Sequence, residues 1–121
     1  MKQRIIVLYG HSLVLSAVGA CLQQKPDFRI LNMEGVPPDY LKKANAAHPQ
    51  VVLFDITLNP HFAALLMRNY PKIIPIGIDL ARHQIWLPSG KFIHLFTSDD
   101  LVTAIETEML RHARTSDEYG L

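Results

Sequence analysis

The feature that most constrains this chain is an apolar run that ends at a single carboxylate. Residues 49–55 read Pro-Gln-Val-Val-Leu-Phe-Asp, so four large apolar residues follow one another and stop at Asp55. A run of this kind, entered from a proline, is typical of a strand buried on both faces of a parallel sheet. Open α/β sheets bind ligands at the carboxyl ends of their strands, so Asp55 is the first candidate functional residue. The alternative, that Asp55 only caps the strand or the next turn, stays open.

The composition favours one α/β domain and excludes several other classes of protein. The 121 residues are 49% hydrophobic and 19% charged, which suits a single domain over residues 1–121. The net charge of +1 comes without a basic stripe, so we expect no direct nucleic acid binding and no membrane binding. One cysteine excludes an internal disulfide. No apolar stretch is long enough for a signal peptide or a membrane span, so a cytoplasmic location is expected.

A second apolar run opens the chain and leads directly into an uncharged helix. Residues 4–9 form the expected first strand, residues 10–12 form a turn, and a helix is expected from residue 13 to about residue 24. This helix is apolar nearly all round and needs cover on two sides. Either it packs inside a small domain, or Leu15 and Leu22 meet a partner chain, as in a homodimer through this helix.

Strands and helices then alternate as far as residue 79. The expected elements are an edge strand, a short helix that ends before Pro49, the strand that ends at Asp55, a third helix and a fourth strand, at residues 28–33, 38–47, 51–55, 62–69 and 73–78. Pro75 lacks an N–H group, so a bulge or a local gap is expected in the fourth strand.

The pattern changes after residue 79. Two short runs, at residues 84–87 and 91–96, flank a Pro-Ser-Gly sequence that has the chemistry of a hairpin turn, so a helix hardly fits there. A last helix is expected to follow, with Ser98 as its N-cap and two acids in its first turn. We expect residues 113–121 to form a frayed tail.

This order of elements resembles the receiver domain of response regulators, the flavodoxin-like (CheY-like) module of two-component signalling. The likeness is carried by the first apolar run with its uncharged helix, by the run that ends at Asp55, and by Leu-Asn-Pro at residues 58–60. It implies a doubly wound, parallel, five-stranded sheet in the order 2-1-3-4-5. The fourth helix of that fold would here be replaced by a hairpin or a short irregular segment.

Residue by residue, the resemblance keeps one functional position of receivers and loses the others. Asp55 matches the aspartate that receivers phosphorylate. The acidic pair that holds Mg²⁺ falls on Tyr9 and Gly10, the Ser/Thr that senses the phosphoryl group falls on Gly77, and the lysine falls on Thr97. A carboxylate without a bound cation is a poor phosphoryl acceptor. The resemblance therefore implies a pseudo-receiver in which Asp55 is a structural remnant.

Receivers commonly signal through the surface around their fourth helix, and a hairpin that carries Trp86 would change which partner can dock there. We expect Trp86 to plug the sheet edge, because free apolar edges promote aggregation. The alternative is a recognition edge at residues 85–87.

Other chemistries find little support. His11 and His61, together with Asp55, would make a legitimate set of transition-metal ligands, but their spacing has no metal-binding signature and they are expected to be solvated loop residues. Cys21 is expected on the buried side of the first helix, where a thiol is inert. No phosphate-binding glycine loop and no nucleophile elbow are present in the sequence.

The sequence therefore predicts a non-enzymatic, cofactor-free signalling domain that acts through protein–protein interaction. Two alternatives stay open. One is a receiver still phosphorylated on Asp55 in a phosphorelay, with Mg²⁺ held by replacement ligands such as Asp79. The other is a small flavodoxin-like enzyme or metal-binding domain. The partner, the pathway and the signal are not encoded in any motif.

Overall fold

The computed structural model describes residues 4–10, 13–33, 48–56, 61–79, 81–95 and 97–118. The elements in chain order are β1 (Arg4–Tyr9), α1 (Leu13–Leu22), β2 (Phe28–Met33), β3 (Val51–Asp55), α3 (Phe62–Asn69), β4 (Ile74–Asp79), β5 (Gln84–Trp86), β6 (Phe92–His94) and α4 (Ser98–Glu118). The short helix expected at residues 38–47 lies outside the described residues.

The strands form one mixed sheet of six strands in the order β2-β1-β3-β4-β5-β6. Strands β1 to β4 are parallel, whereas β5 is antiparallel to both β4 and β6. The α/β class and the order of the first four strands are confirmed, but the expectation of a five-stranded, fully parallel sheet is wrong. Only residues 80–83 separate β4 from β5, and so short a connection cannot make the crossover that a parallel pair needs.

The predicted hairpin in place of a helix is confirmed. Trp86 pairs with Phe92 across β5 and β6, and the Leu87 N–H donates to the Lys91 carbonyl at 2.9 Å. Gly90 takes a φ of 89° in the turn, a conformation that costs glycine little. Strand β6 pairs with β5 on the side away from β4, so β5 is an interior strand and not the sheet edge. The alternative of a recognition edge at residues 85–87 is therefore wrong.

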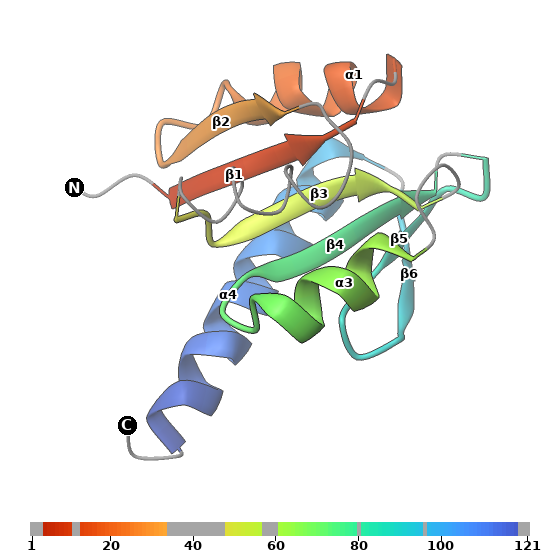
Figure 1. Cartoon of the computed structure of the whole chain (residues 1–121). Helices are drawn as coiled ribbons and strands as arrows, with labels where there is room; N and C mark the ends of the chain where they lie inside the picture. Colours follow the sequence, from red (N-terminus) through yellow and green to blue (C-terminus); the bar gives the residue numbers. More distant parts are fainter. Residues whose placement is uncertain are drawn as a thin grey trace.

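Two apolar layers enclose the sheet. Helix α3 covers one face, and helices α1 and α4 cover the other (Figure 1). Phe54, Leu66 and Ile105 are 0% exposed, and full burial of such a side chain contributes about 1.5–3 kcal/mol. Helix α1 lies so close to β1 that a Cβ atom on Gly19 would stand 2.7 Å from Leu8 Cδ1. The opposite side of α1 is exposed at Cys21, so the expectation of a buried thiol is wrong.

Strand β4 runs through Pro75 without the bulge or gap that was expected there. Strand β4 pairs with β3 from Ile74 to Ile78, including Val52 with Pro75. Strand β5 pairs only with the second half of β4, from Gly77 to Asp79. Pro75 therefore lies beside β3 alone among the described strands, and its missing N–H removes a donor that would have had no partner there.

Helix α4 is longer than expected and extends past the sheet (Figure 1). It runs from Ser98 to Glu118, so the backbone is helical at residues 113–118, which were expected to form a frayed tail. Residues 119–121 lie outside the described part. Across the described helices, none is both long and apolar enough to cross a membrane.

Candidate functional site

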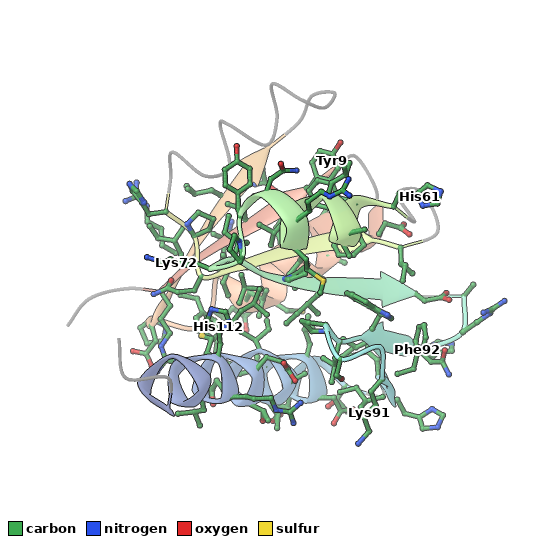
Figure 2. The ribbon with its side chains drawn as sticks, turned by 60° about the horizontal axis from the view of Figure 1, so that its bottom comes forward. Tyr9, His61, Lys72, Lys91, Phe92 and His112 are labelled. Carbon is green, nitrogen blue, oxygen red and sulfur yellow. The ribbon has the colours of Figure 1, made fainter. Side chains whose placement is uncertain are left out.

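The candidate site lies at the edge of the sheet where β1, β3 and β4 end. Tyr9, Asp55 and Asp79 are the last residues of these three strands. Figure 2 shows Tyr9 near His61 at this edge, with Lys72 and His112 at the other end of the molecule. Adjacent parallel strands have their carboxyl ends at one edge of the sheet. Three residues far apart in the sequence therefore lie at the same edge.

Asp55 ends β3 as a nearly buried residue with 8% of its surface exposed. It pairs in register with Ile78 of β4. Successive residues of a strand face opposite sides, so every second residue shares a face, and Val51 and Leu53 belong to the layer beneath α1 and α4. The Asp55 side chain therefore belongs to the α1 and α4 side of the sheet.

An aromatic side chain stands where a receiver has an acid. Tyr9 is 5% exposed and its ring stacks on Phe62 of α3, with centroids 4.1 Å apart. Phe62 also meets Phe54 edge to face at 5.3 Å. Burial raises the pKa of the Tyr9 hydroxyl, so this position stays neutral and supplies no charge to a metal ion.

Gly77, which the resemblance aligns with the phosphoryl-sensing hydroxyl, lies against Phe54 and Ile56. A Cβ atom there would lie 3.2 Å from Phe54 Cζ and 3.3 Å from Ile56 Cβ. Gly77 pairs with Phe54 on one side and with Trp86 on the other, and the absence of a side chain lets the two rings meet edge to face at 6.4 Å. We call Tyr9, Phe54, Phe62 and Trp86 the aromatic cluster. It fills the α3 face of this edge.

Thr97, the position of the receiver lysine, is bonded into the start of α4. Its N–H donates to Asp100 Oδ2 at 2.8 Å, and the Asp100 N–H lies 3.3 Å from Thr97 Oγ1. These two reciprocal bonds make a capping box. Thr97 is therefore the N-cap, and the assignment of that role to Ser98 is wrong, because Ser98 already belongs to the helix.

Asp79, the candidate replacement for a Mg²⁺ ligand, lies on the face of the sheet opposite to Asp55. Ile76 and Ile78 face the α1 and α4 layer, so the alternation of β4 puts the Asp79 side chain on the α3 face, opposite to Asp55. Its carboxylate holds the turn that follows: Oδ1 accepts from the Arg82 N–H at 3.2 Å, and Oδ2 lies 3.9 Å from Arg82 Nε.

The histidine and carboxylate set predicted as a metal alternative is not brought together. His61 is exposed and precedes α3, on the face opposite to Asp55. His11 lies outside the described residues. Within the described ranges, no group of three His, Cys, Asp or Glu side chains is placed to hold a metal ion. Gly10, which the resemblance aligns with the second acid of a receiver's Mg²⁺ site, has a φ of 115°.

The three predicted interface positions differ in exposure. Leu22 is 1% exposed and packs into the core, so it offers no surface to a partner. Trp86 is half-buried against Phe54, but its strand β5 lies inside the sheet, so Trp86 does not plug the sheet edge as expected. The side chain of Leu15 lies outside the described part. Among the side chains of α1 that the structure describes, residues 16–22, the exposed ones are Ser16, Ala17, Ala20 and Cys21, which are small and uncharged.

The packing of Phe62 on other aromatic rings was not predicted from the sequence. A helical pattern shows which face of the helix is apolar, but not which side chains of the sheet that face contacts. The signal for Gly77 was present, since a glycine within an apolar strand marks close packing. The opposite facing of Asp55 and Asp79 also follows from counting strand positions, once β3 and β4 are placed in register.

Comparisons of the chain with protein-family models, with curated proteins and with solved structures found no match.

Proposed function

We propose that this chain is a receiver-like signalling domain that has lost phosphoryl transfer and acts by binding protein partners. The observation that carries the proposal is the aromatic cluster. Tyr9 and Gly77 stand at two positions that bring metal binding and hydroxyl contact in receivers, and both are packed with rings instead. Phosphoryl transfer to Asp55 would lack a cation to neutralise the phosphate oxygens.

The flavodoxin-like architecture belongs to this proposal. The order β2-β1-β3-β4 of the parallel strands, with helices on both faces, supports it. The antiparallel β5 sets the chain apart from a receiver, because it separates β4 from β6. A partner that docks on the fourth helix of a receiver would meet a hairpin here.

The partner surface that we propose is the exposed side of α1, against a second copy of the chain. Ser16, Ala17, Ala20 and Cys21 are exposed, and small residues let two helices approach closely, with axes about 8–10 Å apart. No charged residue occurs in α1, so a second copy would meet no charge repulsion from this helix.

Cross-linking through Cys21, the only cysteine, tests this surface. A short bismaleimide should link two chains in the wild type, and Ala17→Arg should abolish the link and reduce the mass in sedimentation to that of a monomer. In the control variant, Cys21→Ser combined with Lys91→Cys, the thiol moves to the hairpin and no link should form. A wild-type protein that sediments as a monomer at high concentration would end the proposal of self-association.

A further inference from the structure

A second candidate site lies at the opposite edge of the sheet, where the parallel strands begin. A cavity of about 310 Å³ opens there between the strand starts and α4. Its polar lining consists of Arg4, Gln50, Lys72 and His112. Figure 2 shows Lys72 and His112 together at this end, away from Tyr9 and His61. The volume is at the lower end of the range for small-molecule sites, about 300–1,000 Å³.

Every polar side chain among the described lining residues can donate a hydrogen bond or carry positive charge, and none of them is an acid. The ion pairs found within the described ranges join other residues: Lys25 with Asp99, Arg82 with Asp79, and Arg111 with Glu108. Arg4 and Lys72 thus face the cavity without a described carboxylate to balance them. Clustered cations in a concave surface concentrate anions.

Gln50 provides a fixed donor in this cavity. Its backbone N–H donates to the Ile5 carbonyl at 3.0 Å, and its own carbonyl accepts from the Ile74 N–H at 2.9 Å. Its side-chain Oε1 accepts from the Ile5 N–H at 2.7 Å. Because the Ile5 N–H group can only donate, the side-chain oxygen must face it, and the Nε2 amide group is left to donate elsewhere. The donor is therefore held by the sheet before any ligand arrives.

The apolar part of the lining defines the rest of the ligand. Ile74 is buried, Met109 is half-buried, and Leu110 is 64% exposed. An exposed leucine beside cations suits a molecule that has an apolar group next to its charge. A nucleic acid would instead require a basic surface that continues beyond one pocket.

We propose that this cavity binds a small organic oxyanion, a carboxylate or a phosphate monoester that carries a short apolar chain. Arg4 and Lys72 neutralise the charge, Gln50 Nε2 donates to one oxygen, and Ile74 and Met109 contact the chain. The site is separate from the Asp55 edge, so it does not depend on the proposed signalling role.

Nuclear magnetic resonance titration of the full chain tests this proposal, with butyl phosphate and pentanoate as probes and butanol as the neutral control. We expect saturable shifts of the Gln50 side-chain amide with at least one anion and none with butanol. Gln50→Glu keeps an oxygen for Ile5 and adds a negative charge, so affinity should fall at least tenfold. Lys72→Gln should weaken binding about threefold to tenfold, and Lys91→Gln, on the distant hairpin, should leave it unchanged.

Three results would overturn the proposal. The first is the absence of saturable shifts, and the second is equal affinity in the Lys72→Gln and Lys91→Gln variants. The third is tighter binding to a DNA oligonucleotide or to anionic vesicles that disappears in the same variants, because that would assign the cations to a macromolecule. If Gln50→Glu fails to fold, Arg4→Gln replaces it, since Arg4 is exposed and its loss leaves the sheet contacts in place.

Discussion

At the scale of single residues, Gly77 explains how the aromatic cluster packs at the edge where the parallel strands end. The Phe54 and Trp86 rings meet across it, and any side chain would enter the space that they fill. A serine or threonine at position 77 would not fit without a shift of Phe54 or Ile56.

Gly77→Ala should therefore lower the free energy of unfolding by about 1–3 kcal/mol, the usual cost of overpacking a core. Replacing a glycine in a strand by alanine ordinarily raises the free energy of unfolding by about 0.5–1 kcal/mol. Overpacking and this ordinary effect therefore predict changes of opposite sign in urea denaturation. In a Phe54→Leu background the cost should shrink, because the Cζ atom 3.2 Å from the new Cβ is gone. A stabilised Gly77→Ala variant would show that the rings yield easily.

Tyr9 predicts a dependence of stability on alkaline pH. Its pKa is raised by burial, so the unfolded chain loses this proton at a lower pH than the folded chain. The contribution of Tyr9 to the free energy of unfolding is fully present below the pKa of the unfolded chain, about 10. It is lost as the pH rises through the pKa of the folded chain. Urea denaturation at pH 8 and pH 10.5 should show a larger loss of stability for the wild type than for Tyr9→Phe. Equal losses would contradict the burial of a neutral tyrosine.

At the scale of elements, the start of α4 depends on the Thr97–Asp100 capping box. Thr97 and Asp100 satisfy backbone N–H groups that a helix start leaves without partners. Thr97→Ala should cost about 1 kcal/mol in unfolding free energy, whereas Thr97→Ser keeps the hydroxyl and should cost much less. Equal losses in the two variants would mean that the cap contributes nothing.

Local chemistry predicted the elements well, and long-range pairing was harder to predict. The turn at residues 88–90 and the apolar run that ends at Asp55 were both interpreted correctly from the sequence, because their cause lies within a few residues. The direction of β5 depends on the length of the connection before it, and the capping box depends on a side chain three residues away. The sequence alone favoured the wrong alternative in both cases.

At the scale of the whole molecule, the two edges of the sheet differ in chemistry. The edge where the parallel strands end carries the aromatic cluster and the buried Asp55. The edge where they begin carries Arg4, Lys72 and the amide of Gln50 around an open cavity. Sequence patterns place residues along strands and helices, and so they predicted the Asp55 edge. The other edge assembles side chains from four separate segments, which no local pattern can bring together.

The central claim is our proposal that the edge around Asp55 does not perform phosphoryl transfer. The most direct measurement is the intact mass of the protein after incubation with a small acyl phosphate, with and without Mg²⁺, beside the Asp55→Asn variant. We predict that neither protein gains a phosphoryl group under either condition. A Mg²⁺-dependent adduct in the wild type that is absent from Asp55→Asn would contradict the account and show that Asp55 is still a phosphoryl acceptor.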